Sequence, residues 1–164
     1  MYEHLWFKEG VFDKRDVGTW KNGTTGTLVQ WQPSDEFFKN TVVEVEKIKS
    51  LFKTIVCLCP GLTINFDDNG KKTIFYSEHG LNDLVDDYVG DKEILKNRFD
   101  MNFAEGKYKM DLVMTYTSNY SLTIVPYVNT GLTETGPHIT QLKTTLTREF
   151  NKFFKEKKWL KEKD

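Results

Sequence analysis

The stretch from Leu62 to Tyr76, LTINFDDNGKKTIFY, restricts the fold of this chain more than any other part of the sequence. Leu62, Ile64 and Phe66 alternate with polar residues before Asp-Asn-Gly, and Ile74 and Tyr76 alternate after it. Alternation with a period of two is typical of strands, and Asn-Gly is a favoured two-residue turn between antiparallel strands. The sequence therefore predicts a β-hairpin here.

Amphipathic helices are predicted on both sides of this hairpin. Upstream, apolar residues recur with helical spacing until Pro60-Gly61 ends the segment; they are Ile48, Leu51, Phe52, Ile55 and Val56. Downstream, EHGLNDLVDDYVG predicts a short helix, whose inward residues are expected to be Leu81, Leu84, Val85 and Tyr88. Each helix has one apolar stripe to bury.

Further strands are predicted near both ends of the chain. YEHLWF and TLVQWQP read as strands on either side of a turn-rich stretch, and Ser34 or Asp35 can cap a brief helical turn after Pro33. The segment KYKMDLVMTYT places alternate residues on one face, and we expect it to pair with SLTIVPYVN through the turn SNY. The residues of that face are Tyr108, Met110, Leu112, Met114 and Tyr116.

A long helix is predicted after Gly136, with Pro137 at its first position. Its apolar stripe consists of Ile139, Leu142, Leu146, Phe150 and Phe153. We expect this stripe to pack on the apolar face of the strand at 108–116. The order of helices and hairpins predicts an α+β fold with sheet and helix layers.

Charge is nearly balanced over the whole chain but is concentrated at its end. The chain has 23 Lys and Arg and 24 Asp and Glu, whereas the segment from Gln141 to Asp164 holds eight basic and four acidic residues by count. Lys143, Arg148, Lys152 and Lys155 therefore form a candidate DNA-facing set, although acidic residues among them also suit an ordinary solvated helix. No apolar run approaches the roughly 18 residues of a membrane span, so we expect a cytoplasmic protein without a membrane partner.

The residue types that support catalysis do not combine into a site in this sequence. His4, His79 and His138 are far apart, and Cys57 and Cys59 lack the further ligands of a metal centre. No activated nucleophile or glycine-rich phosphate loop is present. The sequence therefore predicts no catalytic residue and no metal ligand, and it predicts that both cysteines are structural thiols.

Six segments, taken in order, resemble the ATPase (B) subunits of bacterial and phage type II DNA topoisomerases, gyrase and topoisomerase IV. They are YEHLWFKEG, TGTLVQWQPSDEFF, CLCPGLTINFDDNGKKTIFYSEHGLNDLV, MDLVMTYTSNYSLTIVPYVNT, ETGPHITQLKTTLTREFNKF and LKEKD. The family's Gly-Gly-Thr-His reads Thr-Gly-Pro-His at 135–138 in this chain. The resemblance covers nearly the whole sequence and leaves gyrase and topoisomerase IV undistinguished.

The resemblance implies three parts. Residues 1–33 correspond to the last strands of a GHKL-type ATPase domain, and 34–45 to a connector. Residues 46–164 correspond to a transducer domain similar to domain 2 of ribosomal protein S5, which ends before the family's Gln-Thr-Lys loop. The family's catalytic glutamate and magnesium ligand would precede Met1, so Thr27 is the one residue that matches a nucleotide contact.

The intact subunit implied by the resemblance binds ATP and magnesium and couples hydrolysis to DNA strand passage. Its partners would be DNA, the DNA-cleaving A-type subunit and a second B subunit. Gln141-Leu-Lys143 matches the start of the transducer helix and not the phosphate-sensing loop, so the chain alone is expected to lack ATPase activity. Two alternatives stay open: a free-standing nucleic-acid-binding or adaptor module with an S5-like fold, and a mimic that interferes with a topoisomerase.

Overall fold

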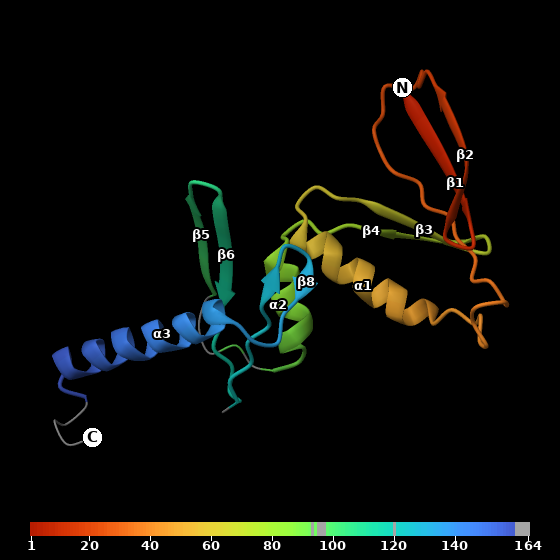
Figure 1. Ribbon diagram of the computed structural model, residues 1–164. Coiled ribbons are helices and arrows are strands. Elements are labelled where there is room, and N and C mark those ends of the chain that lie inside the picture. Colours follow the sequence, from red (N-terminus) through yellow and green to blue (C-terminus); the bar gives the residue numbers. More distant parts are fainter. Residues whose placement is uncertain (93, 95–97, 120, 160–164) are drawn as a thin grey trace. The chain divides into compact units, whose positions relative to one another are not determined.

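The computed structural model describes residues 1–92, 94, 98–119 and 121–159, and the chain divides into two compact units, Met1–Glu44 and Val45–Asp164. Its named strands form separate two-stranded antiparallel hairpins, which Figure 1 shows beside three helices. The elements are β1 (Tyr2–Lys8), β2 (Val11–Gly18), α1 (Val45–Leu58), β3 (Ile64–Asp68), β4 (Lys71–Phe75), α2 (Leu81–Val89), β5 (Phe99–Glu105), β6 (Tyr108–Met114), β7 (Tyr127–Val128), β8 (Gly131–Leu132) and α3 (Pro137–Glu156). Within the described ranges, no helix has both the length and the apolar character of a membrane span.

The first unit is built around the β1–β2 hairpin. Glu9 and Gly10 form its turn with φ of 54° and 79°, the left-handed values that a tight hairpin turn requires. The register shifts between Trp6 and Phe7, where the ladder is irregular. Further along, Ser34 accepts hydrogen bonds from the backbone N–H groups of Phe37 and Phe38, so the predicted capped turn after Pro33 is confirmed.

The strand predicted for TLVQWQP is wrong, because residues 19–34 contain no strand. The partner of β1 is instead the run from Val11 to Gly18, which follows the Glu9-Gly10 turn directly. This run holds four consecutive charged residues and therefore lacks the apolar alternation on which the prediction relied. The chain reverses locally because the turn geometry favours the nearest segment over a distant one.

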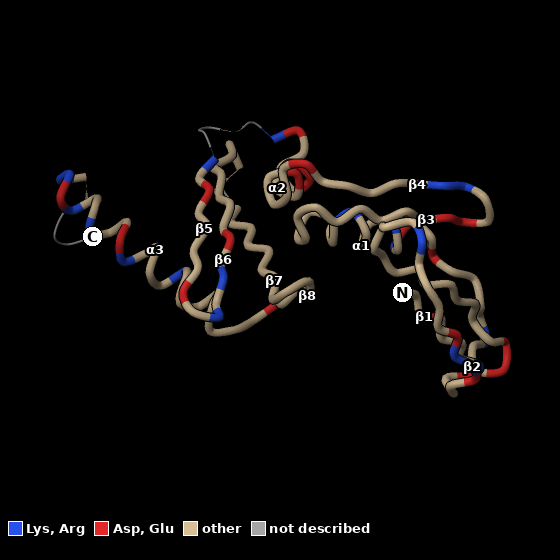
Figure 2. The backbone as a smooth tube through the Cα atoms, turned by 90° about the horizontal axis from the view of Figure 1, so that it is seen from above, with Lys and Arg blue, Asp and Glu red and all other residues tan. Residues whose placement is uncertain are grey.

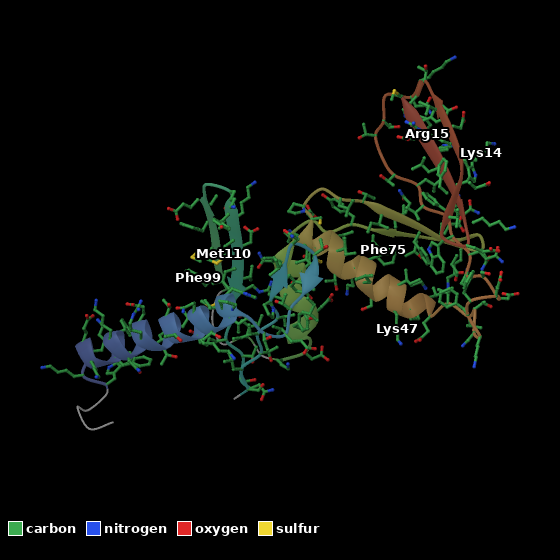
Figure 3. The ribbon with its side chains drawn as sticks, viewed as in Figure 1. Lys14, Arg15, Lys47, Phe75, Phe99 and Met110 are labelled. Carbon is green, nitrogen blue, oxygen red and sulfur yellow. The ribbon has the colours of Figure 1, made fainter. Side chains whose placement is uncertain are left out.

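The core of the second unit lies between α1 and α2. Its buried residues are Val56, Cys57, Ser77, Leu84 and Val89. The β3–β4 hairpin packs on α1 through Phe52, whose ring meets those of Phe66 and Phe75 edge-on at centroid distances of 5.5 and 5.8 Å. Figure 3 labels Phe75 beside α1. Asp87 on α2 also forms an ion pair with Lys53 on α1, with Oδ1 and Nζ 2.6 Å apart.

The predicted β3–β4 hairpin and its turn are confirmed. Ile64 pairs with Phe75 and Asp68 with Lys71, and both turn residues have positive φ, 50° at Asn69 and 93° at Gly70. The side chain of Asp67 accepts a hydrogen bond from the N–H of Gly70 at 2.7 Å. Figure 2 shows the acidic residues of β3 opposite the lysines of β4 at this end of the hairpin.

The two predicted helices on either side of this hairpin are confirmed. Two residues that were expected to be buried in them are exposed. Leu51 is 53% exposed and Tyr88 is 46% exposed, whereas Val89 is buried at 8%. The interface between α1 and α2 covers only part of each stripe, so residues at its margin remain in contact with solvent. Cys57 is buried and Cys59 is half-buried, and both are free thiols.

The predicted pairing of 108–116 with 121–129 is also wrong. β6 pairs with β5 through the turn at Gly106 and Lys107, while Tyr127 and Val128 pair with Leu132 and Gly131. The sequence FDMNFAEGKYKMDLVM carries the same signal as β3–β4, since apolar residues alternate on both sides of a glycine-containing turn. Gly106 has φ of 58°, the left-handed value that a tight hairpin turn between β5 and β6 uses.

α3 begins at Pro137 as predicted, but its packing on the β6 face is not observed. Within the described residues α3 packs on neither β5 nor β6. Phe150 and Phe153 are 40% and 43% exposed, and Met110 is 45% exposed. Phe99 and Met110, labelled in Figure 3, project from the β5–β6 hairpin. Periodicity identified two apolar faces but could not identify what covers each of them.

Candidate nucleic-acid interface

The helix that carries the predicted DNA-facing residues has a well-defined start. Pro137 occupies its first turn, where a missing N–H costs nothing, and Ile139 and Thr140 donate backbone hydrogen bonds to the carbonyl of Gly136 at 3.2 Å. Leu142 and Leu146 continue the apolar stripe and are half-buried. These residues define the apolar side of α3, which is the reference for the positions of its basic residues around the helix.

Arg148, Lys152 and Lys155 lie on one face of α3. They are spaced i, i+4 and i+7, so at about 100° per residue they fall within a narrow arc on the side opposite the apolar stripe. All three are exposed. The seven steps from Arg148 to Lys155 span about 10 Å along the axis. The face presents three exposed cations, which can neutralise phosphates of a nucleic acid.

Acidic residues reduce the net positive charge along this side of α3. Arg148 donates from Nε to Oε1 of Glu149 at 2.9 Å, and both side chains are largely exposed. Figure 2 accordingly shows blue and red segments in turn along α3. An exposed pair of this kind contributes little to stability and opens readily. Arg148 can therefore exchange its partner for a phosphate at small cost.

Lys143 does not belong to the same face. It is five residues before Arg148, which places it about 140° away around the helix. Lys143 lines a hollow of about 440 Å³ together with Glu134, the segment from Leu122 to Pro126, and Ile139. The structure therefore separates Lys143 from the other three predicted DNA-facing residues.

An aromatic cluster at the end of α3 was missed in the sequence. The ring centroids of Phe150 and Phe154 are 6.0 Å apart, and Trp159 lies 5.9 Å from the rings of both Phe153 and Phe154. Lys157 places its Nζ 5.8 Å from the centroid of the Phe153 ring. The i, i+3 and i+4 spacing of the phenylalanines could have revealed this cluster, but the return of Trp159 depends on the turn after the helix.

Thr27, the predicted nucleotide contact, lies in the first unit. It is exposed and sits in a segment without regular secondary structure. The other candidate site residues, Lys143, Arg148, Lys152 and Lys155, belong to the second unit.

Serine, histidine and aspartate do meet at the start of α2, but not in the order that catalysis needs. The Ser77 hydroxyl donates to Oδ2 of Asp83 at 2.7 Å and accepts the N–H of Gly80 at 2.8 Å. The His79 ring lies 3.3 Å from the other oxygen of Asp83. Because Asp83 stands between the serine and the histidine, the imidazole has no serine proton to take. The cluster instead satisfies the polar groups at the start of α2.

The electrostatics of this region fit a structural role. The hydrogen bond from Ser77 holds the pKa of Asp83 below its usual value, which keeps the carboxylate ionised. Burial raises the pKa of the Cys57 thiol, and burial together with the nearby Tyr88 hydroxyl raises the pKa of Tyr127 to about 12. Across the described ranges no cluster of three or more His, Cys, Asp or Glu could hold a metal ion.

Comparison with known proteins places this chain in a family. The family model of DNA gyrase B matches residues 80–164, just over half of the sequence. The B subunit of DNA gyrase from Campylobacter jejuni is 29% identical over 147 residues, covering 88% of this chain and 19% of that protein. The B subunit of DNA topoisomerase 4 from Bacillus subtilis is also 29% identical over 147 residues, covering 88% of this chain and 22% of that protein. The chain belongs to the DNA gyrase B family of type II topoisomerase B subunits.

A solved structure supports the same assignment. The crystal structure of the 43K ATPase domain of Thermus thermophilus gyrase B, in complex with an aminocoumarin, matches with a TM-score of 0.65 at 25% identity. The match covers 80% of this chain and 37% of that one, and it confirms the predicted α+β fold. The chain spans about a fifth of the length of the two curated relatives.

Proposed function

We propose that this chain is a segment of the B subunit of a type II DNA topoisomerase. Its role there is to couple ATP binding and hydrolysis to DNA strand passage. The observation that carries the proposal is the similarity to the B subunits of gyrase and topoisomerase 4 over 88% of the chain. The intact subunit would bind ATP and Mg²⁺. Its partners would be DNA, the DNA-cleaving A-type subunit and a second copy of the B-type chain.

Within this proposal the two compact units belong to different domains of the intact subunit. Residues 1–33 would complete a GHKL-type ATPase domain, 34–45 would connect, and 46–164 would form the transducer with its S5-like fold. The boundary between the units falls after Glu44, within the proposed connector. A division at that point supports a lever in which the second unit moves as a body, because a packed core transmits displacement better than a chain of loose side chains.

The residues that the structure describes do not fit a nucleotide by themselves. Thr27 offers one hydroxyl, and among the described residues no group of three or more His, Cys, Asp or Glu could hold Mg²⁺. We therefore assign no catalytic step to this chain. Its contribution is mechanical, and Thr27 would add one hydrogen-bonding group to a pocket formed with other residues of the intact subunit.

The proposed coupling is testable in a chimera. This chain would replace the aligned segment of the Bacillus subtilis topoisomerase 4 B-type chain, and ATP hydrolysis and DNA relaxation would be measured with the matching A-type subunit. We expect ATP-dependent relaxation. A chimera that hydrolyses ATP normally but passes no strands would contradict the coupling role.

DNA binding through α3 is the second part of the proposal. Changing Arg148, Lys152 and Lys155 together to Glu should weaken binding of the chain to duplex DNA. The slope of log K against log salt should also fall, by about 0.9 for each phosphate that is no longer neutralised. Fluorescence anisotropy at several salt concentrations would measure both quantities. The matched control changes Lys71, Lys72 and Lys109 to Glu, which alters net charge equally on other elements.

Equal effects of the two triple variants would show that only net charge matters, and would remove the DNA-facing assignment. The single variant Lys143→Glu should change the salt slope less than Arg148→Glu, because Lys143 lies beside the hollow and away from the basic face. This comparison tests the separation of Lys143 from its three predicted companions.

The exposed basic face also favours the alternative of a free-standing nucleic-acid-binding or adaptor module. That module would bind DNA tightly without a topoisomerase, whereas a transducer segment should bind weakly. A submicromolar affinity at physiological salt would favour the module, since non-specific binding is typically about 10⁻⁴ to 10⁻⁶ M there. Capture of a topoisomerase by the chain, with inhibition of strand passage, would identify a mimic.

A further inference from the structure

The N-terminal end of α3 contains a hydrogen-bonded cluster that lies outside the proposed DNA-binding face. Thr133 donates to the carbonyl oxygen of Pro126 twice, from its backbone N–H at 2.9 Å and from Oγ1 at 3.2 Å. The same Oγ1 lies 3.2 Å from Nε2 of His138, in the first turn of α3. Three separate segments, at 126, 133 and 138, therefore meet at one hydroxyl.

The Thr133 hydroxyl lies within hydrogen-bond distance of two partners. A threonine hydroxyl carries a single hydrogen, and a carbonyl oxygen can only accept. The hydroxyl therefore either donates to the Pro126 carbonyl and accepts from a protonated Nε2 of His138, or donates to an unprotonated Nε2, according to the tautomer of the ring. In both arrangements this hydroxyl joins His138 in α3 to the segment before the helix.

Gly136 makes room for the ring of His138. A Cβ at Gly136 would lie 2.6 Å from Cε1 and 2.8 Å from Nδ1 of His138, closer than real contacts allow. The φ of Gly136 is 156°, a value that residues with side chains rarely adopt. Pro137 then restricts the backbone between the two. The loop is thus built to hold the imidazole against Thr133.

The contacts of this cluster can fix the direction of the α3 axis. Among the described residues, α3 packs on no other named element. Its first turns adjoin the segment before it, where Ile139 and Lys143 line the hollow beside residues 122–126. A helix held at one end amplifies a small rotation there, because displacement grows with distance along its roughly 30 Å length.

We propose that Thr133 and His138 form a clasp that fixes the direction of α3 relative to the β7–β8 hairpin. His138 is then a positioning residue: it touches no DNA, and it determines where the basic face of Arg148, Lys152 and Lys155 points. The consequence for DNA rests on the proposed function. The clasp itself rests only on the contacts of Thr133, Gly136 and His138.

The experiment measures the direction of α3 by electron paramagnetic resonance distances in the full chain. Spin labels would be placed at Thr147→Cys on α3 and Thr130→Cys in the β7–β8 turn, with Cys59→Ser in the background. Cys57 can remain, since it is buried and its pKa is raised. Circular dichroism would first show that each variant keeps its helices.

Two pairs of variants separate the clasp from a merely structural role. Thr133→Val and His138→Asn remove the hydrogen bond and should increase the population of displaced α3 about fivefold, the usual effect of losing one such bond. Thr133→Ser keeps the hydroxyl, and His138→Gln places an amide N–H near the position of Nε2. Both conservative variants should restore the parental distance distribution.

The outcomes for the clasp and for the proposed function are distinct. Unchanged distances in Thr133→Val and His138→Asn, or equal distances in the Gln and Asn variants, would overturn the clasp whatever the DNA affinity. If the distances broaden while DNA affinity in the same variants stays at the parental value, the clasp is supported and the DNA-facing role of α3 is contradicted. Broadening with weaker DNA binding supports both.

Discussion

Ser77 shows how a buried polar side chain organises the residues around it. It is 6% exposed, and its hydroxyl is used twice, as a donor to Asp83 and as an acceptor from the Gly80 N–H. Ser77 and Asp83 accept from the backbone N–H groups of Gly80 and His79 just before α2, while the carbonyl of Gly80 accepts the backbone N–H groups of Asp83 and Leu84. Asp83 is the charged member of this arrangement.

The pKa of Asp83 makes a prediction about acid stability. Ser77 lowers the folded-state pKa of Asp83, so the carboxylate stabilises the native state fully above its unfolded pKa of about 3.9, and this contribution is lost as pH falls through the folded value. Asp83→Asn should therefore be less stable than the parent at neutral pH and approach it below about pH 4. Urea unfolding at several pH values would measure this difference.

The control for that experiment is Asp13→Asn, an exposed change on the β1–β2 hairpin. It should leave the pH dependence of unfolding of the second unit as in the parent. A difference between Asp83→Asn and the parent that does not shrink as the pH is lowered through the acid range would mean that the ionised carboxylate is not what stabilises this site.

At the scale of elements, the β3–β4 turn depends on a single glycine. Gly70 has φ of 93°, where a side chain is strained, although a Cβ there would meet no other atom within 4 Å. Gly70→Ala should destabilise the chain by about 1 kcal/mol or more through backbone strain alone. Thermal unfolding measures this change. Gly26→Ala is the matched control, because Gly26 has equal space and no positive φ, and it should be neutral or slightly stabilising.

The residues in the apolar stripe of α1 differ in how deeply they are buried. Val56 is 2% exposed and Leu51 is 53% exposed. Val56→Ala should therefore cost more than Leu51→Ala, although leucine loses more atoms, because only the buried site leaves a cavity. Denaturant unfolding of the two variants gives the order directly. The reverse order would mean that Leu51 is covered in solution.

At the scale of the whole molecule, the chain is expected to lack ATP turnover. Thr27 is its single proposed nucleotide contact, and it is exposed in a segment without regular secondary structure. A coupled assay of the purified chain should give background rates with or without DNA and Mg²⁺. Turnover that copurifies with the chain and is abolished by Thr27→Ala would contradict this expectation.

Local patterns predicted the elements with short-range causes. The β3–β4 hairpin was predictable because Asn69-Gly70 and the alternation around it agree, and α3 because Pro137 and a continuous stripe agree. The β5–β6 hairpin carried an equally readable signal around Gly106, which the pairing expected for 108–116 overlooked. The grouping of Arg148, Lys152 and Lys155 on one face also follows from spacing alone. Their role toward DNA stays a prediction.

By itself, the sequence determined the helices, the β3–β4 turn, the α+β class and the resemblance to topoisomerase B subunits, since each depends on residues close together or on motifs in order. Only the tertiary structure decided which part of each apolar stripe is buried, that Lys143 lines a hollow beside the segment before α3, and that His138 meets Thr133. Periodicity specifies a face of an element. The residues opposite that face come from elsewhere in the chain, and their identity depends on the path of the backbone between them.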